Sequence, residues 1–427
     1  MEQPQAPQTG KRDAKDPNYE VKVVSMMFVG FALISLDRFI IYPLFPIMSK
    51  DLGLDYADLG LISAATALTW GLSSFFAGNL ADRIGGKTVL VGSAIVFSAM
   101  VAFTGLAGGL ISLLILRALL GAAEGAFVPP AITETMKSSN PKRLGRNFGM
   151  VQMAQPLVGL GVAPIIAVYL LKFLPSWHWV FGVVAIPGFV LAYFMYVGIK
   201  SAKPGSSAAP VGGAPANAGP KPSFLEAFKY RNVRFGALAM TSLLLTMMVQ
   251  STFAPNFLID YIGVPMETMG FLVAAIGVGG LAGMAAFPTL SDKYGRKRTI
   301  TAALVLQFIG TLYLISASSG STPIFIAMAF FCNAMSVSGI TVTLVGPIIN
   351  TSVPRYVAAT ATGAVVGTGE ILGGAGGPAL AGFLSNTYGI QIVPMLMLCG
   401  VIVSTLTIIF GIVEPKPNAA GDDAPKP

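Results

Sequence analysis

The sequence predicts an all-α membrane protein, with twelve transmembrane helices arranged as two pseudo-symmetric halves of six. Composition, a series of long apolar runs and a repeated polar loop lead to this prediction. Of the 427 residues, 54% are hydrophobic and only 11% are charged, whereas soluble domains carry about 25% charged residues. The mean hydropathy is +0.72, which excludes a water-soluble globular protein.

Twelve apolar runs are long enough to cross the hydrocarbon core of a membrane as helices, which takes about 20 residues. The runs are continuous and do not alternate between polar and apolar residues, so they predict helices and not the strands of a barrel. In chain order, the predicted spans cover residues 22–48, 56–81, 87–107, 110–136, 146–172, 176–199, 233–260, 267–290, 299–318, 322–350, 357–385 and 389–413.

The basic residues indicate how these helices are oriented. If both termini lie in the cytoplasm, nearly all of the 27 Lys and Arg residues fall in cytoplasmic segments. Only Lys50 and Lys172 remain outside, while Arg38 and Arg117 lie within the membrane. The positive-inside rule describes this asymmetry. The net charge of +8 therefore reports topology and attraction to anionic lipid headgroups, and nucleic acid is excluded as a partner.

The same pattern sets the predicted domain boundaries. Residues 1–21 are polar and rich in proline, so we expect a disordered cytoplasmic lead and no secretory signal. Residues 22–199 and 232–413 are predicted to form the two six-helix bundles. Residues 200–231 form a cytoplasmic linker in which Pro, Gly, Ala and Ser dominate, and residues 414–427 form a cytoplasmic tail. We expect a multi-pass protein of the bacterial inner membrane that works as a single chain.

A polar loop recurs at the same place in each half. The loop after the second span reads GNLADRIGGK (78–87), and the loop after the eighth reads PTLSDKYGRK (288–297). The two copies indicate a duplicated six-helix unit, and such repeats build carriers with a site at the midplane. The first copy resembles the signature loop of the major facilitator superfamily, and the second departs from it by having Pro288 where the first has Gly78. The resemblance implies the major facilitator fold over about residues 20–415.

The charged residues of the repeated loop are candidate gating groups. Charged groups at a helix end can hold neighbouring helices in one state and release them in another. Plain anchoring of the cytoplasmic helix ends is the alternative. The candidates are Asp82, Arg83 and Lys87 in the first copy and Asp292 and Arg296 in the second.

Five charged residues fall within predicted spans, where charges are costly and therefore functional candidates. They are Asp37 and Arg38 in span one, Arg117 and Glu124 in span four, and Glu370 in span eleven. Arg117 and Glu124 are spaced to return to the same helix face about 10 Å apart. We expect span four to present a cation and an acid to one cavity. Static ion pairs are the alternative, although buried pairs stabilise poorly.

This combination suits a proton-coupled carrier of a small organic anion. A low-dielectric cavity disfavours the charged form of a carboxylate, so such an acid can take up and release a proton near neutral pH. An arginine stays charged and grips a carboxylate with its planar fork. We expect protonation of the acids to free the arginines for the anion, and departure of the anion to restore their pairing with the acids.

Three stretches sharpen the family resemblance. These stretches resemble the anion:cation symporter branch of the superfamily. They are Leu36–Phe39 followed by Pro43 and Pro46, the stretch from Arg117 to Pro129, and Ser176–Phe181. That branch takes up sugar acids and other small carboxylates with protons. By this likeness Asp37 and Glu124 would be the proton sites, and Arg38 and Arg117 would act in anion binding or coupling. Glu370 lies outside that pattern; it is a third candidate proton site, with a hydrogen bond inside its glycine-rich stretch as the alternative.

Polar residues inside apolar runs are candidate substrate contacts. Each could instead bond to a neighbouring helix. The candidates are Tyr42, Gln152, Gln155, Asn256 and Asn333.

Other functions are weighed against this reading. The stretch from Gly373 to Pro378 in span eleven leaves a proton-coupled efflux antiporter for drugs or metabolites as an alternative. A spinster-like lysolipid carrier is a further alternative, because carriers of that type show an Asp-Arg-Phe and a Gly-Glu pair in similar places. A membrane enzyme is not expected, because His178 is the only histidine and no nucleophile–base pair stands out. We expect no metal and no cofactor, with the proton gradient as the energy source.

Overall fold

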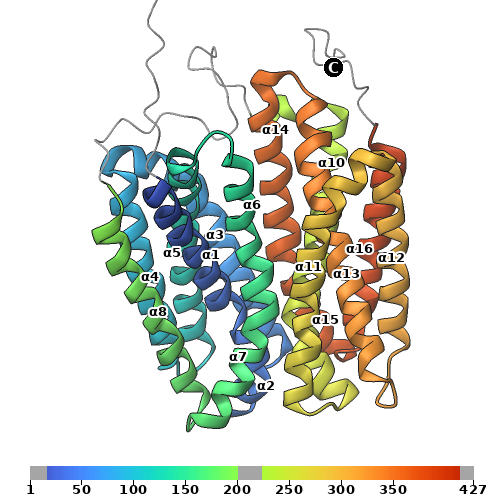
Figure 1. Cartoon of the computed structure of the whole chain (residues 1–427). Helices are drawn as coiled ribbons and strands as arrows, with labels where there is room; N and C mark the ends of the chain where they lie inside the picture. The colour runs from blue at the N-terminus through green and yellow to red at the C-terminus, as the bar shows by residue number, and fades with distance from the viewer. Residues whose placement is uncertain (1–16, 201–223, 414–427) are drawn as a thin grey trace, which may run out of the picture.

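The computed structural model describes residues 17–200 and 224–413. Most of the predicted lead (1–16), nearly all of the linker (201–223) and the tail (414–427) lie outside these residues. Within the described ranges the chain is helical throughout and contains no strand. Figure 1 shows two bundles side by side, the first blue to green and the second yellow to red.

The first bundle contains eight α-helices and one π-helical segment. Their bounds are α1 Pro17–Phe39, α2 Ile41–Leu52, α3 Tyr56–Ile84, α4 Gly86–Thr104, α5 Leu110–Ser138, α6 Leu144–Ala154, η1 (π-helical) Gln155–Val162, α7 Ala163–Phe173 and α8 Trp177–Gly198.

The second bundle begins after the undescribed segment. The bounds are α9 Phe224–Ala227, α10 Arg231–Asn256, η2 Phe257–Ile262, α11 Met266–Tyr294, α12 Arg296–Ser316, α13 Pro323–Thr343, η3 Leu344–Ile349, α14 Arg355–Thr368, η4 Gly369–Ala375, α15 Gly376–Tyr388, α16 Ile392–Leu406 and η5 Thr407–Gly411.

Twelve membrane helices in two sets of six account for these elements. Eleven helices of the described residues are long and apolar enough to cross a membrane, among them Pro17–Leu52, which joins α1 and α2. The remaining predicted span, 357–385, which is the eleventh in chain order, lies within α14, η4 and α15, which follow one another with helical backbone at each junction. This stretch is rich in glycine, alanine and threonine, which lowers its hydropathy.

The first span bends between α1 and α2. Pro43 has no N–H to donate to the carbonyl of Phe39, four residues earlier, and its ring crowds that carbonyl. α1 accordingly ends at Phe39, and α2 begins at Ile41. The bend places the last turn of α1, with its charged residues, at the middle of the bundle.

The two copies of the repeated loop have the same local structure. Gly85 and Gly295 each separate two helices, with φ of 93° and 92°. Residues with a side chain rarely adopt this backbone conformation, so glycine is strongly favoured at both places. Asp82 and Asp292 are both exposed one turn earlier. The duplicated unit inferred from the sequence is therefore present in the backbone as well.

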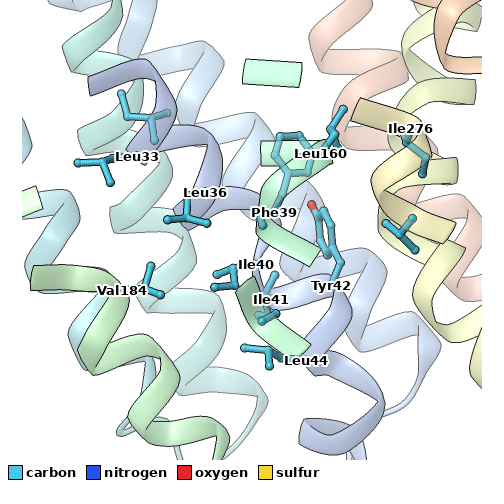
Figure 2. Close-up of a cluster of buried hydrophobic side chains, with 14 of the residues drawn as sticks. Leu33, Leu36, Phe39, Ile40, Ile41, Tyr42, Leu44, Leu160, Val184 and Ile276 are labelled. Atoms are coloured by element: carbon cyan, nitrogen blue, oxygen red, sulfur yellow. The ribbon is translucent and has the colours of Figure 1, made fainter. Parts of the chain in front are cut away.

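The core surrounds the bend of the first span. Figure 2 shows Leu36, Phe39, Ile40 and Ile41 in one buried cluster that extends from Val184 of α8 to Ile276 of α11. The cluster thus joins the two bundles at this level. Asp37 and Arg38, between Leu36 and Phe39 in sequence, are buried as well.

The two bundles meet at one end of the molecule. The extensive contacts between them join α3 with α15, α11 with η1 and α7, and α2 with α10. A side chain at Gly60 would collide with the backbone at Pro378, and one at Gly277 with the backbone of Gly161. We call this the closed end; it carries Tyr56, Lys172, Asp260 and Asn386.

The opposite end is spread apart. The main contacts of α6 are with α1, η1 and α5 of its own bundle, and those of α14 are with α9, α10, η3 and η4. A side chain added at Gly149 or Gly363 would meet nothing within 4 Å. Figure 1 shows α6 and α14 at the top of the two bundles, with α7 and α15 lower down. We call this the spread end; it carries Asp82 and Asp292.

Candidate functional site

Asp37 and Arg38 lie in the last turn of α1, beside the bend. Both are buried, with exposed fractions of 2% and 6%. Asp37 Oδ1 has no hydrogen-bond partner. The Arg38 guanidinium lies 5.6 Å from the ring centre of Trp70 on α3, a cation–π contact that holds the charge without neutralising it.

Arg117 is held inside the first bundle between α1 and α8. Its side chain is 1% exposed, and its Nη1 donates to the backbone carbonyl of Asp37 at 3.0 Å. The guanidinium also lies 5.5 Å from the ring centre of Phe181. Nε and Nη2 have no partner, so most of the planar fork that could grip a carboxylate is unused.

Glu124 lies two turns further along α5 and is 0% exposed. Neither of its carboxylate oxygens has a hydrogen-bond partner. Its electrostatic partners are Arg38 and Arg117. A buried carboxylate normally has hydrogen bonds, so the two oxygens of Glu124 have unused capacity to accept them.

The ion pairs considered as an alternative are absent in this conformation. Ion pairs within 4.0 Å in the described residues include Arg143–Glu20 and Lys172–Glu267, and none involves Asp37, Arg38, Arg117 or Glu124. Arg117 and Glu124 are both buried inside the first bundle, with exposed fractions of 1% and 0%. The cavity that the sequence predicts beside them is therefore not open to solvent in this conformation.

Glu370 brings an acid from the second bundle to the same place. It lies in the π-helical segment η4, which packs against α3, and its Oε2 is buried without a partner. A side chain at Gly374 would lie 2.9 Å from Oε2, so the glycine makes room for the carboxylate. The cation that acts on Glu370 is Arg38. Arg38 is therefore shared between Glu124 of one bundle and Glu370 of the other.

Tyr42 links this charged group to the second bundle through hydroxyl groups. Its Oη lies 2.9 Å from Ser63 Oγ on α3, and Ser63 Oγ lies 3.2 Å from Thr252 Oγ1 on α10. All three side chains are buried. Sequence reasoning missed Ser63 and Thr252, because hydroxyl residues in apolar helices usually bond to their own backbone and give no signal.

The remaining polar candidates divide between the interface and the interior. Gln152 and Gln155 are half-buried on α6 and η1. Asn256 donates to Asp260 at 3.0 Å near the closed end. Asn333 lies between α12 and α13, where Thr311 donates to its Oδ1 at 2.9 Å. In this conformation Asn333 therefore bonds to a neighbouring helix, which is the alternative that the sequence left open.

Hydrogen bonds and an ion pair cross between the bundles at the closed end. Tyr56 donates from its hydroxyl to Asp260 at 2.9 Å and from its backbone N–H to Asn386 at 3.0 Å. Lys172 of α7 pairs with Glu267 of α11 at 3.3 Å. Sequence reasoning did not single out these residues, because each is an ordinary polar residue at a helix end.

The predicted gating residues lie at the spread end. Asp82 and Arg83 are exposed, and Lys87 lies 5.2 Å from the ring centre of Tyr196. Arg296 donates to the carbonyl of Pro347 at 3.2 Å, within its own bundle. Asp292 is exposed like Asp82. The two loops therefore sit on separated bundles in this conformation.

In the part of the chain that the structure describes, no cluster of three or more His, Cys, Asp or Glu side chains could hold a metal ion.

Comparisons with known proteins agree with this architecture. A hexuronate transporter of Bacillus subtilis (strain 168) is 26% identical over 432 residues, which cover 96% of this chain and 98% of that protein. The quinolone resistance protein NorA of Staphylococcus aureus is 33% identical over 129 residues, covering 30% of this chain and 33% of NorA.

Two solved structures share the fold. A bacterial homolog of the human lysosomal transporter Spinster, inward-facing and occupied, has a TM-score of 0.74 at 16% identity, covering 92% of this chain and 96% of that one. The nucleoside transporter NupG has a TM-score of 0.74 at 13% identity, covering 92% and 98%.

The family model described as Major Facilitator Superfamily matches residues 27–376. The match includes the charged residues of α1, α5 and η4, and both copies of the repeated loop. It identifies a multi-pass membrane transporter and not an enzyme. The chain belongs to the Major Facilitator Superfamily.

Proposed function

We propose that this protein carries a small organic anion, a carboxylate or sugar acid, across the membrane together with protons. The observation that carries the proposal is a group of two arginines and three acids, of which Asp37, Arg38, Arg117 and Glu124 are buried and Glu370 is half-buried. None of the five forms an ion pair in the described residues. The likeness to a hexuronate transporter over nearly the whole chain supports the substrate class.

The cations provide the recognition of the anion. The unused Nε and Nη2 of Arg117 and the shared guanidinium of Arg38 are donors for a carboxylate. Both lie in the first bundle, so the anion binds there first. Gln152 and Gln155 are half-buried nearby on the face of α6 and η1, and they are suited to the hydroxyl groups of a sugar acid.

The acids carry the protons. Asp37, Glu124 and Glu370 each have a carboxylate oxygen without a partner in a water-poor setting, where the charged form is disfavoured. A proton on Glu124 releases Arg38 and Arg117 for the anion, and loss of the anion lets the acids return to the arginines. Anion and proton therefore move together.

The orientation follows from the basic residues. Both termini lie in the cytoplasm of a bacterial cell, so the spread end faces the cytoplasm and the closed end faces outward. The charged loops around Asp82 and Asp292 close the cytoplasmic end in the opposite state. The protein works as a single chain, with the proton gradient as its energy source and no cofactor.

The test is transport in proteoliposomes with a panel of hexuronates and other small carboxylates. We expect accumulation that depends on an inward proton gradient. Glu124→Gln is expected to abolish accumulation while exchange of labelled anion continues, because the anion still binds but no proton is carried. Glu226→Gln, the same change outside the membrane helices, serves as the control. Full proton-driven accumulation by Glu124→Gln would refute the role of this acid.

Drug or metabolite efflux is the second candidate, favoured by the local likeness to NorA and by the glycine-rich stretch of η4 and α15. The same vesicles distinguish the two functions. Proton-driven extrusion of a quinolone, with no uptake of any carboxylate, would replace symport by antiport. Transfer of a lysolipid in the same assay would favour the lipid carrier.

A further inference from the structure

The three-hydroxyl chain, Tyr42–Ser63–Thr252, departs from what hydroxyl groups in helices normally do. On α10, Thr241, Ser242, Thr246 and Ser251 each donate to the backbone carbonyl four residues earlier, the usual arrangement in apolar helices. Thr252, the next residue, bonds instead to Ser63 of the other bundle at 3.2 Å.

Ser63 departs from the same rule on α3. Thr66 and Thr69 on that helix bond to their own backbone, whereas Ser63 bonds to Tyr42 at 2.9 Å and to Thr252. The chain therefore crosses the interface through buried side chains, with Thr252 0% exposed. Since α2, α3 and α10 meet here only while the bundles are together, the chain exists only when this end is closed.

The inner end of the chain reaches the candidate anion site. Tyr42 follows Arg38 by one turn across the bend, and its ring packs edge-on against Phe39, the residue next to Arg38, with 5.8 Å between the ring centres. Three hydroxyl groups have three protons to donate, and the two hydrogen bonds within the chain use only two of them, so one hydroxyl proton stays available for another acceptor. If Thr252 donates to Ser63 and Ser63 to Tyr42, that proton is on Tyr42 and can be donated to an anion.

We propose that the Tyr42–Ser63–Thr252 chain couples anion binding to closure, by holding the two bundles together at the closed end while an anion is bound. An anion that accepts from Tyr42 fixes the direction of all three donors, and hydrogen bonds in such a chain strengthen one another. Anion binding thus stabilises the contact of Thr252 with the first bundle. The proposal rests on the proposed function in assigning the anion to Arg38 and Arg117.

The experiment measures how far the closed end opens, by electron–electron resonance between spin labels at positions 172 and 267. The labelled protein carries Lys172→Cys and Glu267→Cys and lacks its two cysteines through Cys332→Ala and Cys399→Ala. Without anion, Ser63→Ala and Thr252→Val are expected to lower the ratio of short to long distances about fivefold, the usual effect of one hydrogen bond. Thr246→Val is the matched control on α10, and Thr252→Ser keeps the hydroxyl and should retain the original ratio.

The outcomes separate the two proposals. A ratio in Thr252→Val equal to that in Thr246→Val would overturn the chain as a closing element. With glucuronate added, the unaltered chain should shift toward short distances, and Tyr42→Phe should not. A shift of equal size in Tyr42→Phe would remove Tyr42 from the link to the anion. No shift with any carboxylate, while Thr252→Val still opens the end, would count against the anion as substrate and leave the closing role in place.

Discussion

At the scale of single residues, the most informative side chain is Arg117. Its Nη1 is used by the carbonyl of Asp37, which fixes the guanidinium, while Nε and Nη2 point to no partner. A fixed fork with unused donors loses little entropy when it binds a carboxylate. This geometry supports the proposed role of Arg117 in binding the anion, for which a flexible lysine would be less suited.

Arg117→Lys is therefore expected to weaken anion binding about tenfold or more, because lysine keeps the charge but offers no fork. Arg117→Ala should abolish binding. The measurement is the thermal stabilisation by the anion, which falls with affinity. Arg234→Ala, which replaces an exposed arginine in the first turn of α10, should leave the shift unchanged. An undiminished shift in Arg117→Ala would exclude this residue from the site.

The same residues show what sequence alone could predict. Charges within apolar runs are costly, so Asp37, Arg38, Arg117 and Glu124 could be picked out without any structure. Their burial could not be predicted, because it depends on how α5 packs against α1, α3 and α4. Ser63 stayed hidden for another reason, since its residue type is common in membrane helices.

At the scale of helices, close backbone contacts decide where the bundles can meet. Gly277 of α11 faces Gly161 of η1, and Gly60 of α3 faces Pro378 of α15, with no room for a side chain at either glycine. Small residues let membrane helices approach closely. Hydropathy predicted most of the spans because length and apolarity decide where a helix can cross a membrane. It could not predict which glycines form the crossing points, since that depends on residues distant in sequence.

Gly277→Ala is expected to open the closed end, because the added carbon would collide with the Gly161 backbone. The distance between labels at positions 172 and 267 should lengthen, and the rate of net transport should fall at least about tenfold if closure is needed in each cycle. Gly149→Ala is the matched control, because a side chain there meets nothing within 4 Å. Unchanged distances in Gly277→Ala would show that the helices part easily at this crossing.

At the scale of the whole molecule, the asymmetry of the two ends identifies one state of a cycle. The closed end holds the bundles together through Tyr56, Asp260, Lys172 and Glu267, while the spread end carries the repeated loops. A carrier must also adopt the reverse state, with the first end open and the second closed. The repeated loops have the same backbone in both bundles, so they can close that end with equivalent contacts.

Replacing the acid of the first loop tests this cycle. Asp82→Asn is expected to slow net transport by about tenfold or more, because the change affects the state in which the spread end is closed. The thermal shift produced by the anion should stay the same, because the binding residues are intact. Asp292→Asn should act in the same direction, since it occupies the equivalent position. Arg298→Gln, also exposed beside the second loop, controls for a general loss of surface charge.

If Asp82→Asn weakened binding and transport in equal measure, the loop would belong to the site and not to the gate. Equal rates in Asp82→Asn and Arg298→Gln would instead reduce the loop to an anchor for the helix ends.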